Sequence, residues 1–224
     1  MAFTFDGGGE ANVTQEILDI LRDKGVKSTI FLTGDFIRRY PSMVKRMVED
    51  GHEIANHTDT HPHFTAYALN GRHTTLPNVN QDFLFRQLRG AEEAFYSLTG
   101  RRMAPYWRAP YGEENAEIRA WAAEAGYRHI SWTRDYGRKE SLDSRDWVAN
   151  RRSRIYLTAD AIQERILNYG GNKGEGSNGG IVLMHLGTSR PTDQVHKRLP
   201  EIIEALKGRG YRLVTISELL RDGP

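Results

Sequence analysis

Two histidines four residues apart could hold a metal ion. His57 and His61 bound the sequence His-Thr-Asp-Thr-His, directly after a short apolar segment that ends at Asn56. Two imidazoles at this spacing can face one divalent ion if the turn between them is tight. The alternative is a pair of surface histidines, one of which caps a turn. Neighbouring His63 is expected to line the loop rather than to bind metal.

Two acid–base residues also follow apolar runs. Asp6 precedes three glycines; it could take a proton from water, or it could simply form an Asp-Gly turn. Arg108 could pair with that carboxylate and keep it ionised, or could lie on the surface. His185 could protonate a leaving amine if a carboxylate such as Asp146 tuned its pKa. A histidine at that position is otherwise a core residue.

Four more residues could shape a pocket around these groups. Pro110 would make the approach to Tyr111 rigid, and the backbone N–H of Tyr111 could donate to an oxyanion. Trp147 beside Leu183 could form an apolar wall for an acetyl methyl group. The simpler interpretation is a turn before Gly112 and ordinary core packing.

The elements that must position these residues alternate between short apolar runs and amphipathic helices. Helical spacing, C-terminal glycines and Pro41 in a first turn predict helices near residues 13–25, 41–51, 84–100, 114–125 and 195–206. Seven strands are expected: Phe3–Phe5, Thr29–Leu32, His52–Asn56, Pro105–Trp107, Tyr127–Thr133, Gly180–Leu186 and Tyr211–Ile216. The alternation implies right-handed βαβ units, which favour a barrel over an open doubly wound sheet. In a barrel the carboxyl ends of the strands share one rim, so the polar residues above would converge.

Composition excludes several classes of function. A chain of 224 residues fits one domain, taken as residues 1–224, and the absence of cysteine excludes disulfides and thiolate ligands. The 31 basic and 29 acidic residues are scattered, so nucleic acid is not an expected partner. No apolar run approaches the roughly 18–20 residues that span a membrane, and no signal-peptide pattern opens the chain. The oligomeric state, and whether the chain is part of a longer protein, stay open.

Five short motifs together resemble the polysaccharide deacetylases, the NodB-homology or carbohydrate esterase family four. In the order of that family they are Thr4–Gly8, His57–His61, Arg108–Gly112, Asp143–Trp147 and Leu183–His185. Each motif is weak alone, but all five in order are highly specific. The resemblance spans nearly the whole chain and implies a single-domain, distorted (β/α)7 barrel of the TIM-like kind.

The resemblance also implies roles for individual residues. Asp6 is expected to be the base and His185 the acid, with Arg108 orienting the former and Asp146 tuning the latter. Tyr111, after Pro110, is expected to donate to the oxyanion. Trp147 and Leu183 are expected to form the acetyl pocket, and His57 and His61 to bind the metal. The expected cofactor is a divalent metal: zinc, or else cobalt or manganese.

One position departs from the family pattern. The first motif usually ends Asp-Asp, and its second aspartate is the third metal ligand, but Gly7 stands there in this chain. Two histidines bind zinc more weakly than three protein ligands do. Glu10 and Asp59 are the nearest possible substitutes.

The expected reaction is removal of N-acetyl groups from a polysaccharide or oligosaccharide that contains N-acetylglucosamine, such as peptidoglycan, chitin or a biofilm glycan. The alternatives are an O-acetyl xylan esterase, a metal-independent hydrolase of small amides, and a carbohydrate-binding domain without turnover. Such polymers favour the cell envelope or secretion, with the cytoplasm as the alternative. Two long polar loops are expected to wall the groove, residues 62–80 and 148–179, with aromatics that could stack on sugars: Phe64, Tyr67, Tyr156 and Tyr169.

Overall fold

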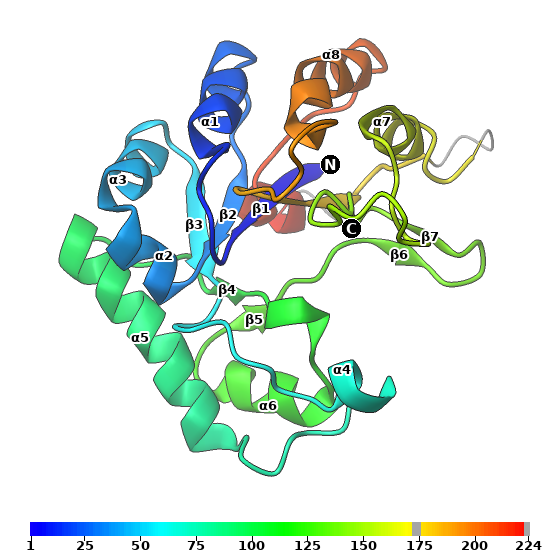
Figure 1. The fold of residues 1–224 in the computed structure, drawn as a ribbon. Helices are drawn as coiled ribbons and strands as arrows, with labels where there is room; N and C mark the ends of the chain where they lie inside the picture. Colours follow the sequence, from blue (N-terminus) through cyan, green and yellow to red (C-terminus); the bar gives the residue numbers. More distant parts are fainter. Residues whose placement is uncertain (172–175, 222–224) are drawn as a thin grey trace.

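The centre of the fold is a curved sheet whose strands all run parallel (Figure 1). The computed structural model describes residues 1–171 and 176–221. The strand order is β5-β4-β3-β2-β1-β8. Their bounds are β1 Ala2–Gly7, β2 Thr29–Leu32, β3 Glu53–Asn56, β4 Tyr106–Trp107, β5 Arg128–His129 and β8 Ile181–His185. With helices around it, the sheet forms a distorted, open barrel, as predicted, and not a flat doubly wound sheet.

Most of the helices follow the strands along the chain and cover the outside of the sheet (Figure 1), whereas the last helix packs its Ile216 against Ala2, Phe31 and Ala55 on the inner face. They are α1 Thr14–Asp23, α2 Gly34–Arg39, α3 Pro41–Glu49, α4 Tyr67–Asn70, α5 Gln81–Thr99, α6 Ala116–Glu124, α7 Ala159–Leu167, α8 Leu199–Gly208 and α9 Ile216–Arg221. Short 3₁₀ turns cover Pro110–Gly112 and Val195–Arg198. Within the described residues, none of these helices has the length and apolarity needed to cross a membrane.

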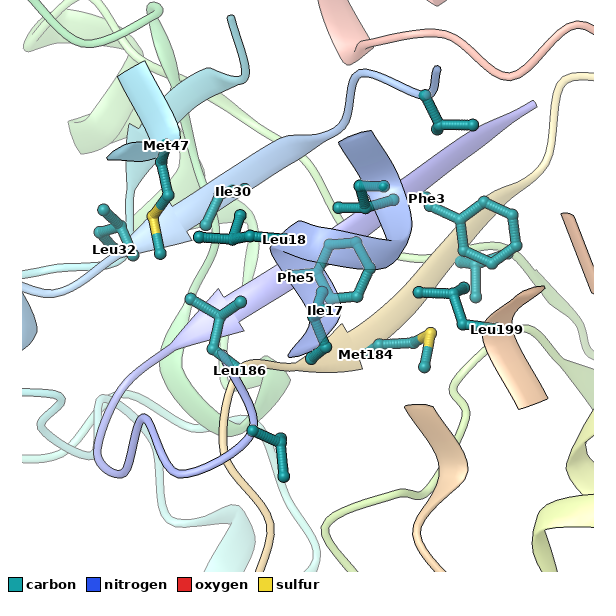
Figure 2. Close-up of a cluster of buried hydrophobic side chains, with 14 of the residues drawn as sticks. Phe3, Phe5, Ile17, Leu18, Ile30, Leu32, Met47, Met184, Leu186 and Leu199 are labelled. Atoms are coloured by element: carbon teal, nitrogen blue, oxygen red, sulfur yellow. The ribbon is translucent and has the colours of Figure 1, made fainter. Parts of the chain in front are cut away.

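The periodicity of β1 determines which of its side chains face the core. Phe3 and Phe5 pack with Ile17 and Leu18 of α1 in the main hydrophobic cluster (Figure 2). Successive side chains of a strand point to opposite faces, so Asp6 lies on the inner face of the barrel, away from this cluster. The apolar alternation that anchors β1 therefore also aims Asp6 into the barrel.

The last predicted strand is wrong. Within Tyr211–Ile216 the described backbone forms no strand: the Met1 amino group donates to the Arg212 carbonyl, the Val214 N–H donates to the Met1 carbonyl, and the Ile216 N–H donates to the Thr29 hydroxyl. The chain then enters α9, because Thr215 and Glu218 form a reciprocal capping box.

The strand predicted over Tyr127–Thr133 is present only as Arg128–His129. Beyond it, the carbonyls of Ile130 and Ser131 accept hydrogen bonds from the Arg108 side chain. These acceptors serve the inner face of the barrel instead of a neighbouring strand, so the ladder stops.

The gap between β5 and β8 is crossed by the segment that leads to Asp146. Thr133 N–H donates to Ile181, and Leu183 N–H donates to Leu142, which lays residues 142–144 along the free edge of β8. A small antiparallel hairpin projects from this segment and consists of β6 Arg134–Asp135 and β7 Glu140–Ser141. This crossing brings the fourth motif beside His185.

Candidate active site

A buried ion pair occupies the inner face of the barrel. Arg108, which follows β4, donates to Asp6 at 2.7 Å, and both side chains are almost completely buried. Its guanidinium lies 4.1 Å from the ring centre of Phe31. Burial alone would raise the pKa of Asp6, but the charges of Arg108 and His185 outweigh it and hold that pKa below its ordinary value. Asp6 is therefore an ionised carboxylate that Arg108 orients.

The two histidines of the second motif lie beside this pair. The Nδ1 of His57 is 2.8 Å from the Arg108 carbonyl, which can only accept, so Nδ1 carries the proton. Its Nε2 is thus unprotonated and lies 3.6 Å from Asp6. The rings of His57 and His61 meet edge to face, with centres 4.8 Å apart. Burial lowers the pKa of both rings, that of His61 to about 3, so both are neutral.

The turn that carries these histidines has strained backbone. Thr58 and His61 both have positive φ, at 70° and 57°, in a region that residues other than glycine seldom adopt. The Asn56 side chain accepts from the Thr58 N–H, and the Thr58 hydroxyl accepts from the His61 N–H. Strain held in place by such contacts is typical of functional sites.

A second acid–base pair lies on the neighbouring strand β8. The Nδ1 of His185 is 2.6 Å from one Asp146 oxygen, and the other oxygen accepts the His185 backbone N–H at 2.8 Å. Burial alone would lower the pKa of His185, but Asp146 outweighs it and, with Asp6 and Asp143, raises that pKa to about 9. His185 is therefore protonated at neutral pH.

The parallel pairing of β1 and β8 places the two pairs side by side. Asp6 and His185 are register partners at the ends of these adjacent strands. One is a carboxylate and the other an imidazolium at the same pH. Groups whose environments push their protonation states apart are the usual sign of a base and an acid.

Tyr111 lies at the rim in a left-handed backbone conformation, with φ of 58°, directly after buried Pro110. Its side chain is 55% exposed, with its ring against His61 and stacked on His63 at 4.1 Å. Buried Glu113 accepts from His63 and from the next two backbone N–H groups. Sequence reasoning missed Glu113, whose only signal is its place after Gly112.

The remaining predicted pocket residues are only partly located. Leu183 is buried and Trp147 is 50% exposed, so the proposed acetyl wall between them stays a prediction. Of the loop aromatics, Phe64 and Tyr169 are buried and pack the loops down, which removes them as sugar platforms. Tyr156 is half-buried and donates to Asp193, which leaves Tyr67 as the exposed candidate.

The side chains do not fit a metal site with three protein ligands. In the part of the chain described here, no group of three or more His, Cys, Asp or Glu residues is arranged to hold an ion. His57 and His61 supply two neutral imidazoles, whereas catalytic zinc usually has three protein ligands. At Gly7, a Cβ would meet Leu32 and Leu186 rather than the histidines.

Neither Asp59 nor Glu10, the two predicted substitutes for the third metal ligand, is placed to complete the ligand set with His57 and His61. The Asp59 carboxylate accepts from Arg38 at 2.8 Å and lies against Gly34 and Gly90, so it serves the packing of helices α2 and α5. Glu10 is exposed and packs its backbone on Gly187 of the loop after β8. The prediction of Asp59 as a ligand is therefore not supported, because its carboxylate is already engaged.

Known proteins share both the sequence and the fold. The family model "Polysaccharide deacetylase" matches residues 1–130. A peptidoglycan-N-acetylglucosamine deacetylase of Bacillus cereus is 32% identical over 222 residues, which cover 99% of this chain and 68% of the relative. The solved Bc1960 peptidoglycan N-acetylglucosamine deacetylase has a TM-score of 0.76 at 29% identity, and the match covers 99% of this chain and 88% of that one.

A second similar structure is BA3943 of Bacillus anthracis, described as a pseudoenzyme of carbohydrate esterase family four. It has a TM-score of 0.74 at 25% identity, and the match covers 98% of this chain and 64% of that one. A mutant of BA3943 is described as having restored enzymatic activity. The family match over more than half of the chain agrees with the five motifs and the barrel, and the chain belongs to the polysaccharide deacetylase family.

Proposed function

We propose that residues 1–224 act as one deacetylase domain that hydrolyses N-acetyl groups on a glycan containing N-acetylglucosamine. The observation that carries this proposal is the pairing of ionised Asp6 with protonated His185 on adjacent strands. Amide hydrolysis needs a base for water and an acid for the leaving nitrogen, and the two residues supply them together. The names of the relatives support N-acetylglucosamine units of peptidoglycan as the substrate class.

The chain's own residues account for the proton transfers. Asp6 takes a proton as the water oxygen bonds to the amide carbon, and the Tyr111 N–H donates to the resulting oxyanion. The carbon–nitrogen bond then breaks, and His185 gives its proton to the departing nitrogen. The products are acetate and a free amine; the proton on Asp6 returns to solvent and His185 regains one. Arg108 and Asp146 hold the base and the acid in place.

Metal dependence is a separate proposal, because the chain offers two histidine ligands instead of the usual three protein ligands. His57 and His61 would bind zinc, cobalt or manganese less tightly than a site with three protein ligands. The missing third ligand also favours a second candidate function, glycan binding without turnover, since a solved relative is described as a pseudoenzyme. The retained pairs of Asp6 with Arg108 and of His185 with Asp146 favour turnover. An extracytoplasmic location, at the cell envelope or secreted, follows from the proposed polymer.

Acetate release tests the proposal. Chitin oligomers and peptidoglycan are the substrates, O-acetyl xylan is the competing one, and each is assayed after chelation and again with zinc restored. We expect acetate from the N-acetylated glycans, lost in Asp6→Asn, and lower after chelation. Release from xylan alone would assign an esterase, and binding of chitin oligomers without acetate release from any substrate would assign the binding function.

A further inference from the structure

A buried arginine after β8 ties together the loop that carries Asp146. Arg190 is 2% exposed, and its guanidinium donates to four backbone carbonyls. Two belong to that loop: Nε donates to Asp146 at 3.0 Å, and one terminal nitrogen donates to Arg145 at 2.8 Å. The other terminal nitrogen donates to Leu157 at 3.0 Å and to Asp193 at 3.3 Å. One side chain therefore joins three separate segments.

The loop needs this support because its backbone is strained. Arg145 has φ of +55°, a conformation that is unfavourable for a non-glycine residue and persists only where its surroundings hold it. The Arg145 carbonyl accepts the shortest of the four hydrogen bonds. The next residue, Asp146, directs both carboxylate oxygens at His185. A shift of the backbone at 145–146 would therefore carry the carboxylate away from the imidazole.

The shape of the arginine side chain is essential to these contacts. Its planar fork reaches several carbonyls at once, whereas a lysine ammonium is a point charge on a flexible stem. The Tyr156 ring lies 4.6 Å from the guanidinium carbon of Arg190 and helps to fix its plane. Lysine at this position would keep the charge but lose the simultaneous contacts.

We propose that Arg190 is a positioning residue that holds the loop of Arg145 and Asp146 in the conformation in which Asp146 orients His185. Arg190 acts only through this loop. The proposal rests on the proposed function insofar as His185 is the acid, while the hold on the loop is a property of the fold itself.

The test compares Arg190→Lys with the unmodified chain and uses Arg46→Lys as a matched control. Arg46 is a largely buried arginine of α3 that pairs with Asp19 and Asp50. The first measurement is the NMR titration of the His185 ring, assigned by comparison with His185→Gln. The second is kcat and KM for acetate release from chitin oligomers.

In Arg190→Lys we expect His185 to lose its proton at lower pH than in the unmodified chain. We also expect kcat to fall about 10- to 100-fold with little change in KM. Arg46→Lys should leave both unchanged. An unaltered His185 titration in folded Arg190→Lys would overturn the proposal, whatever its activity.

Failure of the proposed function and failure of Arg190→Lys to fold can each be distinguished from failure of the proposal on Arg190. Absence of acetate release by the unmodified chain would count against the proposed function, while the NMR titration would still decide on Arg190. If Arg190→Lys does not fold, Tyr156→Leu removes the ring beside the guanidinium. In that variant we expect a smaller change of the His185 titration in the same direction, and no change would overturn the proposal.

Discussion

At the scale of single residues, the glycines after Asp6 decide how the histidine pair can bind a metal. The family pattern places the third ligand at Gly7, but a Cβ there would meet Leu32 at 2.7 Å and Leu186 at 3.0 Å, both apolar. A Cβ at Gly8 would instead meet the His61 ring, 3.1 Å from Cδ2 and 3.3 Å from Nε2, and a small movement of that ring would accommodate it. Gly8 has no positive φ, so a side chain there needs no strained backbone.

This geometry predicts that Gly8→Asp tightens zinc binding more than Gly7→Asp does. We expect a gain of at least about tenfold, equal to about 1.4 kcal/mol, because a carboxylate at residue 8 can share an ion with His61. Calorimetric titration with zinc measures the gain. Gly9→Asp is the control, since a Cβ at Gly9 meets nothing within 4 Å. A larger gain in Gly7→Asp would restore the ligand position of the family pattern.

Most site residues could be predicted because their types and places are unusual in the sequence. Asp6, His57 and His185 each end or follow an apolar strand, and that signal is local. Glu113 and Arg190 could not be found in this way, since their roles depend on backbone groups that only the folded chain brings to them.

At the scale of elements, the turn of His57–His61 depends on close approach of α5. The Gln87 side chain accepts from two backbone N–H groups of the turn, and the Leu88 carbonyl accepts from Asn56. A Cβ at Gly90 would lie 2.6 Å from the Asp59 carboxyl carbon. Glycine in the middle of α5 therefore permits the contact despite its low helix propensity.

We accordingly expect Gly90→Ala to destabilise the fold. Alanine gains up to about 1 kcal/mol of helix propensity, but the clash with Asp59 costs about 1–3 kcal/mol and prevails. Gly208→Ala, at the end of α8, is the control because nothing lies within 4 Å of a Cβ there. Thermal unfolding should give a lower Tm for Gly90→Ala and an equal or higher Tm for Gly208→Ala. A higher Tm for Gly90→Ala would refute the close packing of α5.

Elements with regular periodicity and caps could be predicted, and those set by tertiary contacts could not. The Asn80 side chain caps the N-terminus of α5, and Gly100, in the left-handed backbone conformation, ends the helix. Local residue types therefore determine both ends. The helix α9 also begins with a local signal, the capping box Thr-Ile-Ser-Glu. The apolar residues just before it nevertheless favour a strand when the sequence alone is considered. Similarly, β5 is short because Arg108, distant in the sequence, binds the carbonyls of Ile130 and Ser131, which directly follow it.

At the scale of the whole molecule, the barrel joins an acid and a base from opposite ends of the chain. Asp6 lies on the first strand and His185 on the last, and only the parallel pairing of β1 with β8 makes them neighbours. The sequence predicts both strands and, through the barrel, the rim that they share, but it does not predict that the two strands pair directly. The opposite charges of the two groups at neutral pH are therefore a property of the folded chain.

The pH dependence of kcat/KM for acetate release, compared between the unmodified chain and Asp146→Asn, tests this account most directly. Asp146, with smaller contributions from Asp6 and Asp143, raises the pKa of His185 from 6.5 to about 9, so activity should persist through neutral pH and fall as His185 loses its proton near pH 9. Asparagine keeps the shape but removes the charge, so burial, which lowers the pKa of His185, should shift the falling limb toward acid. A falling limb that stays in place in Asp146→Asn would show that His185 is not the acid.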